Sequence, residues 1–211
     1  PFLESHAKEL AADVCVVSDT GMWDQETPAI TAMLRGLVYA EVVLRGPGHD
    51  LHSGMYGGTV RNPINALAEL IAKLHDAKGR ITLPGFYDAV RPIPEELAAC
   101  WRSLEFSEAE FLGSAGVRQG WGEAGFTTLE RMWARPTCDC NGIVAGYTGV
   151  GAKTVIPAEA RTKVSCRLVP DQDPEKIFAA LESFVARESP QGCTTEVIRH
   201  SGAPAIRVPI D

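Results

Sequence analysis

A few side chains of this sequence are of types that carry chemistry when they lie together. Asp19 ends a short apolar run, and His49, Asp50 and His52 fall within four consecutive positions. Carboxylates and imidazoles bind metal ions, so both places are candidate metal sites. Spacing alone favours simpler interpretations: Asp19 caps a turn, and the histidines belong to a polar loop because glycines flank them.

Other candidate functional residues lack the neighbouring residues that their chemistry requires. Cys138 and Cys140 would share one face of a strand, but no second close cysteine pair completes a structural zinc site. Ser53 follows a histidine but lacks the strand–turn–helix elbow of a serine hydrolase. The glycine-rich stretches 46–48 and 149–151 lack the lysine and the spacing of phosphate-binding loops. Spacing alone therefore predicts no active site here.

The composition excludes several classes of protein. The chain has 211 residues, of which 45% are hydrophobic, and a formal net charge of −7. An acidic chain has no basic excess with which to bind nucleic acid, and its apolar runs are too short to span a membrane. The charged start of the sequence predicts no secretory leader. The six cysteines look like buried thiols of a reducing compartment, which predicts a cytoplasmic protein.

The first half of the chain contains two predicted strands and a helix. Residues 1–10 indicate the end of a helix, and the apolar run 13–17 indicates a strand buried on both faces. Residues 37–44 are β-branched and aromatic, which is typical of a long strand. Asn62 and Pro63 predict a helix start as N-cap and first helical residue. The apolar face of that helix would hold Ile64, Leu67, Leu70, Ile71 and Leu74.

The second half repeats this pattern. Residues 141–148, 154–168 and 194–200 predict strands, and Asp173 with Pro174 predicts a second helix start. The strand over 154–168 alternates, with Ala160, Thr162, Val164 and Cys166 on one face and Arg161, Lys163, Ser165 and Arg167 on the other. From the pattern alone, Arg167 is a strand residue whose default interpretation is a surface salt bridge.

Between the two halves, residues 80–136 are broken by prolines and glycines and predict short helices at 95–104, 107–112 and 126–133. Without this helical insertion the order is strand, helix, strand, strand, helix, strand. That order predicts an α+β fold, a ferredoxin-like sandwich (βαββαβ) in which two helices cover one face of an antiparallel sheet. The fold hosts many activities and by itself indicates none.

Longer motifs carry more information than spacing. Residues 50–58 (Asp-Leu-His-Ser-Gly-Met-Tyr-Gly-Gly), Asn62-Pro63 and residues 83–88 (Leu-Pro-Gly-Phe-Tyr-Asp) resemble the carnosinase-like di-zinc peptidase family. Residues 153–157 and 167–174 match a second block of that family in the same order. Its members include non-specific dipeptidases, glutamate carboxypeptidase, acetylornithine deacetylase and succinyl-diaminopimelate desuccinylase. The block 83–88 and the helical insertion resemble the dipeptidase branch.

The resemblance implies a division of the chain. Family members have a catalytic α/β domain with two zinc ions and a smaller lid domain that forms a homodimer. By this comparison residues 1–34 are a piece of the catalytic domain and residues 35–202 are the lid, with the insertion at about 80–136. Residues 203–211 would return toward the catalytic domain. The family's other zinc ligands and its catalytic glutamates match no position here, which indicates part of a longer protein.

The resemblance also implies roles for four residues. Asp19 corresponds to an aspartate that binds one zinc ion. His52 corresponds to the lid histidine that reaches across the dimer to the scissile carbonyl of the substrate. Thr154 and Arg167 correspond to residues that hold the C-terminal carboxylate of the substrate. Arg167 suits that role physically, because a guanidinium pairs with a carboxylate through two hydrogen bonds.

The implied function is zinc-dependent hydrolysis of dipeptides by a longer protein, with two zinc ions, or manganese or cobalt, as cofactors. We expect the chain alone to bind no stoichiometric zinc and to be inactive. We expect a homodimer through residues 35–79 and 153–200, small peptides as substrates, and no binding to nucleic acid or membranes. An N-acyl-amino-acid deacylase and a non-catalytic dimerisation module remain as alternatives.

Overall fold

The computed structural model describes residues 2–16 and 21–208, and it divides into two compact units. The larger unit spans Met33–Val208. The described residues before Met33 belong to the smaller unit, and the helix described there is α1 (Phe2–Ser5). The helix end predicted at residues 1–10 is therefore confirmed only for this short stretch.

The strand predicted at residues 13–17 is wrong over its described part, 13–16, where the backbone is irregular. Val14 and Val16 are 76% and 84% exposed. An apolar run becomes a buried strand only with other strands beside it and layers over both faces. The described part of this unit provides no such neighbours. Val17 and Asp19 lie outside the described residues.

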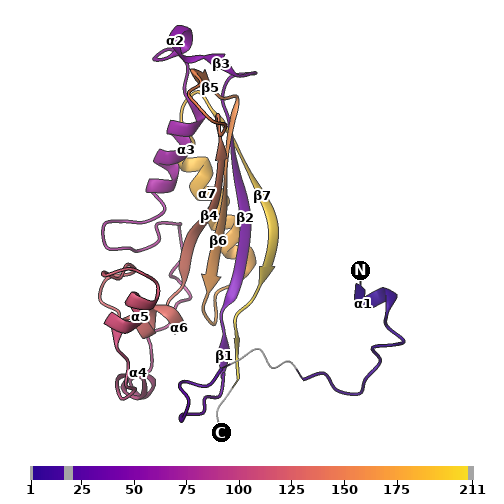
Figure 1. Cartoon of the computed structure of the whole chain (residues 1–211), viewed down its shortest axis with the longest axis vertical. Helices are drawn as coiled ribbons and strands as arrows, with labels where there is room; N and C mark the ends of the chain where they lie inside the picture. The colour runs from indigo at the N-terminus through magenta and orange to yellow at the C-terminus, as the bar shows by residue number, and fades with distance from the viewer. Residues whose placement is uncertain (1, 17–20, 209–211) are drawn as a thin grey trace. The chain divides into compact units, whose positions relative to one another are not determined.

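Four long strands form one antiparallel sheet in the larger unit (Figure 1). In spatial order they are β4 (Thr137–Ala145), β6 (Glu159–Leu168), β2 (Gly36–Arg45) and β7 (Thr194–Ala203). The central pair runs in continuous register from Gly36↔Leu168 to Arg45↔Glu159. Two short ribbons stand apart from this sheet: β1 (Met33–Leu34) with β8 (Ile206–Arg207), and β3 (Leu51–His52) with β5 (Val155–Ile156).

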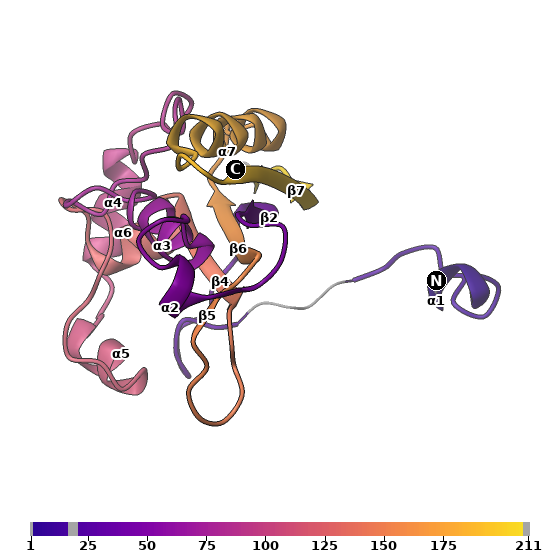
Figure 2. The same ribbon diagram turned by 90° about the horizontal axis from the view of Figure 1, so that it is seen from above.

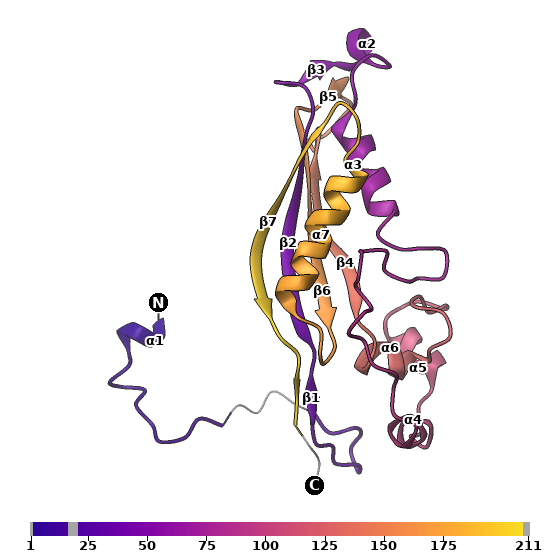
Figure 3. The ribbon, with the colours of Figure 1, turned by 180° about the vertical axis from the view of Figure 1, so that it is seen from behind.

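Two helices, α3 (Pro63–Ala72) and α7 (Pro174–Glu188), lie against the same face of the sheet (Figure 2, Figure 3). Both begin where the sequence predicts. Asn62 Oδ1 accepts a hydrogen bond from the Ile64 amide at 2.9 Å, and Asp173 Oδ1 accepts one from the Glu175 amide at 2.9 Å. Over residues 2–16 and 21–208, the structure has no helix that combines the length and the apolar character needed to cross a membrane.

The core lies between the two helices and the sheet. The predicted alternation of β6 is confirmed, because its helix-facing residues are buried and the opposite ones are at least partly exposed. The largest fully buried side chains are Phe86, Phe184, Leu44, Leu67, Leu70, Leu74, Leu168, Leu181, Val38, Val42, Val43 and Val164. Phe86 belongs to the predicted 83–88 motif, and its carbonyl accepts a hydrogen bond from buried Gln172 at 2.8 Å. That part of the motif is therefore structural.

Two strand boundaries differ from the prediction. The strand expected at residues 154–168 is two strands, since Pro157 and Ala158 separate β5 from β6. Proline has no N–H to donate to a ladder, and here it marks the point where the chain leaves the short ribbon for the main sheet. The strand expected at residues 141–148 begins four positions earlier, because β4 pairs with β6 from Thr137 onward.

The insertion contains the three predicted helices, α4 (Glu95–Arg102), α5 (Glu108–Ser114) and α6 (Thr128–Trp133). Its polar centre is Glu123, which is only 5% exposed. The Glu123 carboxylate accepts hydrogen bonds from Arg135 at 2.7 and 2.9 Å and from Arg80 at 2.9 Å. This buried ion pair ties the start of the insertion to its end.

The cysteines differ from the prediction of buried thiols. All six are free, and Cys138 and Cys166 are buried, but Cys15, Cys100 and Cys140 are exposed. The buried pair lies cross-strand on β4 and β6, facing the helices. Burial of a cysteine depends on which strand position it occupies, and the sequence count does not reveal that.

Glu123→Gln is expected to lower the free energy of unfolding by about 3–5 kcal/mol, because Arg135 would keep a buried charge without its partner. Urea unfolding of both forms measures this. Glu95→Gln is the matched control, since Glu95 pairs with Arg102 at the surface, where such pairs contribute about 0–1 kcal/mol. Equal losses in the two variants would show that the buried pair adds no special stability.

Candidate functional site

The short β3–β5 ribbon brings together two segments that are about a hundred positions apart in the sequence. Leu51 pairs with Ile156 and His52 with Val155. The Ser53 amide donates to the Thr154 carbonyl at 3.1 Å, and the Asp50 carboxylate accepts a hydrogen bond from the Ala158 amide at 2.9 Å. We call residues 50–54 and 154–158 the arm.

His52 and Thr154 meet at this arm. His52 Nε2 lies 3.1 Å from Thr154 Oγ1, and His52 Nδ1 accepts a hydrogen bond from the Gly54 amide at 3.0 Å. Both residues are exposed. The structure therefore brings together two of the residues that the resemblance singles out.

The two hydrogen bonds determine where the imidazole carries its proton. A backbone amide can only donate, so Nδ1 must present a lone pair to the Gly54 N–H. In the neutral ring the proton then sits on Nε2, which donates to the Thr154 hydroxyl. His52 is thus arranged with Nε2 as an N–H donor on an exposed arm, and it can offer that hydrogen to an oxygen of a bound molecule.

The local backbone at His52 differs from the predicted polar loop. His52 ends β3 and is the N-cap of the helical turn α2 (Ser53–Tyr56), accepting from the Gly54 amide as cap residues do. The side chain that was expected to belong to a polar loop therefore projects from the junction of a strand and a helical turn. His49 is exposed.

Arg167 lies at the other end of the sheet. It faces Leu37 on β2 and Thr137 on β4. It is eight positions from Glu159 along β6, which at about 3.3 Å per residue corresponds to about 26 Å. The structure does not bring Arg167 together with His52 and Thr154 within one chain. Asp19, the expected metal ligand, lies outside the described residues.

Among residues 2–16 and 21–208, no group of three or more histidine, cysteine or acidic side chains is arranged to hold a metal ion. Cys138 and Cys140, weighed as zinc ligands, lie on β4 without such a group. A zinc site needs three or four protein ligands. The described residues thus do not by themselves fit a zinc ion.

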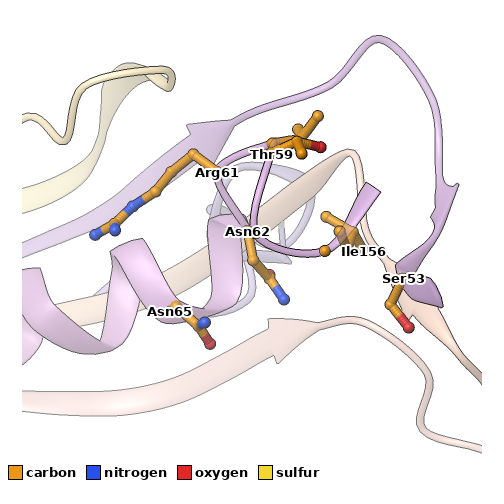
Figure 4. A pocket seen from close by; sticks show the side chains of 9 residues that line it. Ser53, Thr59, Arg61, Asn62, Asn65 and Ile156 are labelled. Atoms are coloured by element: carbon orange, nitrogen blue, oxygen red, sulfur yellow. The ribbon is translucent and has the colours of Figure 1, made fainter. Parts of the chain in front are cut away.

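A hollow of ≈ 400 Å³ adjoins the arm (Figure 4). Ser53 and Ile156 border it from the arm, while Asn62 and Asn65 border it from the start of α3. The Arg61 guanidinium turns away from Ser53 and pairs with Glu69. The hollow is completed by Gly57, Gly58, Thr59 and Val60. It offers hydroxyl and amide groups beside His52.

Sequence reasoning missed Gly54 as a determinant of the arm. A Cβ at Gly54 would lie 2.7 Å from His52 Cε1 and 3.0 Å from Nδ1, so no side chain fits there with the ring in place. Gly54 belongs to the quoted 50–58 motif, which was the only available sign of its role. The contact itself becomes visible only when the ring is positioned in three dimensions.

Comparison with known proteins identifies the larger unit. The family described as "Peptidase dimerisation domain" matches residues 33–193. The Cys-Gly metallodipeptidase DUG1 of Saccharomyces cerevisiae is 34% identical over 196 residues, covering 90% of this chain and 40% of that protein. The human Beta-Ala-His dipeptidase is 33% identical over 175 residues, covering 83% of this chain and 34% of that protein.

Solved structures share the fold. The M20 family metallo-carboxypeptidase Sso-CP2 from Sulfolobus solfataricus superposes with a TM-score of 0.75 at 32% identity, covering 96% of this chain and 53% of that chain. This chain thus spans about two fifths or less of the length of the two dipeptidases and about half of the solved carboxypeptidase.

Gly54→Ala is expected to displace the His52 ring and to lengthen its bonds to the residue-54 amide and to Thr154. The new methyl group would overlap the ring at 2.7 Å. Nitrogen-15 NMR of the imidazole measures this as a shift from a single Nε2–H tautomer toward a mixture. Gly48→Ala is the control, since a Cβ there meets no atom within 4 Å. An unchanged His52 spectrum in Gly54→Ala would contradict the role of Gly54.

Proposed function

Because the chain belongs to the peptidase dimerisation domain family, we propose that it is the lid and dimerisation domain of a longer zinc-dependent metallopeptidase. That protein would hydrolyse dipeptides and release the C-terminal amino acid. Within it, residues 1–34 and 203–211 would be parts of the catalytic domain, and residues 35–202 the lid. The order β4-β6-β2-β7, with α3 and α7 on one face, supports assigning the lid to the ferredoxin-like sandwiches.

The observation that carries this proposal is the placement of the His52 ring, whose Nδ1 accepts from the Gly54 amide and whose Nε2 lies 3.1 Å from Thr154 Oγ1. When water attacks an amide, negative charge develops on the carbonyl oxygen. A donor whose ring is already held in place stabilises that charge once the carbonyl oxygen replaces the Thr154 hydroxyl as its acceptor. We assign His52 this role. Thr154, which the resemblance assigns to the substrate's C-terminal carboxylate, lies against the His52 ring in this chain and would also hold that ring in place.

The substrate's C-terminal carboxylate would bind Arg167, whose guanidinium can form two parallel hydrogen bonds with it. Arg167 is about 26 Å along β6 from the start of that strand. A fully extended dipeptide spans only about 7 Å. One substrate therefore cannot touch His52 and Arg167 of the same chain, and the two residues would come from two copies in a homodimer.

Two zinc ions, or manganese or cobalt ions, would polarise the scissile carbonyl and activate the attacking water in the longer protein. Asp19 would provide one ligand. The described residues contain no metal-binding group, so most ligands would come from elsewhere in that protein. The roles assigned to His52, Thr154 and Arg167 concern binding and hydrogen bonding and do not depend on which metal is present.

Two alternatives have less support. An N-acyl-amino-acid deacylase would use the same lid, but both of the relatives named above carry dipeptidase names. A purely non-catalytic dimerisation module describes the 211-residue chain by itself, for which we propose no hydrolysis. The free cysteines fit a reducing compartment, which is the basis for proposing a cytoplasmic location.

The homodimer would form at the β4 edge of the sheet. This edge lies outside the ranges 35–79 and 153–200 predicted for the interface, so the proposal departs from the sequence prediction. Within those ranges β2 and β6 are paired on both sides and cannot add a strand, and β7 is the other edge strand of the sheet. Of the two edge strands, β4 exposes large apolar side chains, with Ile143 59% and Val144 68% exposed. An exposed apolar edge is a template for pairing, and a two-fold contact needs only its own copy.

Ile143→Lys combined with Val144→Lys is expected to convert a dimer of the chain into a monomer, since charge on a paired apolar edge is repelled by its own copy. Light scattering at several protein concentrations measures the mass. Thr194→Lys on the opposite edge, β7, is the control and should leave the dimer intact. A wild-type chain that stays monomeric at high concentration, or a dimer lost only in the Thr194 variant, would refute this interface.

In the longer protein, His52→Ala is expected to lower kcat by about 10²–10³ with unchanged metal content, because its hydrogen bond strengthens only in the transition state. Arg167→Ala should chiefly raise KM, since the carboxylate is charged in both ground and transition states. Steady-state kinetics with metal analysis separates the two effects.

The control is the 211-residue chain alone, which should show no turnover. Loss of metal in His52→Ala would make His52 a ligand and refute its assigned role. An unchanged kcat would show that His52 is an ordinary surface histidine without a role in catalysis.

A further inference from the structure

We call the face of the sheet opposite α3 and α7 the open face. Its charged side chains form ion pairs at one end of the sheet, whereas two arginines at the other end do not. At the end near the arm, the charges are paired. Arg45 binds Glu196 at 2.7 Å and Glu159 at 3.0 Å, and Arg161 binds Glu41 at 3.4 Å. These pairs cover Val43, which is fully buried on the same face.

At the far end of the open face two arginines stand without such partners. Arg35 immediately precedes β2, and Arg167 lies opposite Leu37 of that strand. Within the described part of the chain, neither forms a hydrogen bond or an ion pair, whereas most other arginines bind a carboxylate. Arg118 and Arg207 are also unpaired but lie exposed to water. Arg35 differs from them because it is half-buried.

Arg35 lies two positions before Leu37, the β2 residue that faces Arg167, and the positive charges of the two arginines act on each other. Burial is the main cause that lowers the pKa of Arg35 below its ordinary value, and the charge of Arg167 lowers it further. Asp139, on the neighbouring strand β4, acts in the opposite direction. A half-buried guanidinium beside a like charge is unfavourable unless a ligand compensates it.

We propose that Arg35 and Arg167 together form a binding site for one carboxylate group. In this site Arg35 is a second guanidinium, beside that of Arg167, that binds the substrate's free carboxylate. The identity of the ligand as substrate rests on the proposed function. The existence of the anion site rests only on the two arginines and their surroundings.

Charge and shape favour a carboxylate. The two arginines and Asp139 carry a net charge of +1 (two positive, one negative), which one singly charged anion neutralises. A planar carboxylate matches the planar fork of a guanidinium, and its two oxygens can be shared between two such forks. A doubly charged phosphate would leave the site negative beside Asp139. A free carboxylate would thus be recognised, and its amide rejected.

The first experiment uses the 211-residue chain and two probes that differ only in charge, N-acetylglycine and N-acetylglycinamide. We expect N-acetylglycine to shift the Nε–Hε NMR signals of Arg35 and Arg167, and the amide to leave them unchanged. Arg35→Gln should weaken binding about tenfold or more, which is the usual size of a charge-assisted hydrogen bond. Arg35→Lys should lie between, because it keeps the charge but loses the fork.

Arg118→Gln is the matched control and should bind like the wild type. Thermal unfolding of each variant shows whether it is folded, and Arg35→Lys tests the site if Arg35→Gln is not. Equal affinity for acid and amide, tighter binding of inorganic phosphate, or unchanged affinity in a folded Arg35→Gln variant would each overturn the proposal.

The second experiment uses the longer protein and separates this inference from the proposed function. Arg35→Gln should raise KM for a dipeptide with a free carboxylate and leave KM for the amidated dipeptide unchanged. If the dipeptide is hydrolysed and Arg167→Ala raises KM while Arg35→Gln does not, the role of Arg35 is wrong and the proposed function stands. If no dipeptide is hydrolysed but the chain binds N-acetylglycine, the proposed function fails and the carboxylate site stands.

Discussion

The pairing of β2 with β6 is the contact on which the rest of the structure depends. It joins segments more than a hundred residues apart in one register, from Gly36↔Leu168 to Arg45↔Glu159. The segment after β2 leads into β3, and β5 leads into β6. This single ladder therefore also places both halves of the arm at the same end of the sheet. At the opposite end it places Arg35 beside Arg167.

Because side chains alternate along a strand, a slip of one residue in this ladder would exchange the two faces of β6. The charged residues Arg161 and Arg167 would then lie under the helices, and the apolar residues of the core would meet water. Burial of residues such as Val164 and Leu168 against α3 and α7 therefore stabilises this register of β2 with β6. The geometry of both ends of the sheet depends on the same apolar packing.

The length of the ladder also shapes the proposed function. Strand β6 places Arg167 about 26 Å from the end of the sheet that carries the arm, so under the proposed function one dipeptide would need residues from two chains. The dimer would then be part of the active site, beyond its contribution to stability. The exposed apolar edge at Ile143 and Val144 offers a surface on which such a dimer could form. The buried Glu123–Arg135 pair serves the separate task of holding the insertion together.

The sequence by itself determined what depends on neighbouring residues. Asn62 and Asp173 start helices because an N-cap acts on amides two positions away, and the faces of β6 follow from alternation. The quoted motifs singled out His52, Thr154 and Arg167 as candidate site residues. Tertiary structure alone decided the rest. Residues 13–16 form no strand since the described residues of that unit offer no partner strands. Cys140 is exposed beside a register shift of β4, while Cys138 on the same strand is buried. The His52 tautomer, the role of Gly54 and the meeting of Arg35 with Arg167 depend on contacts that exist only once distant segments are paired.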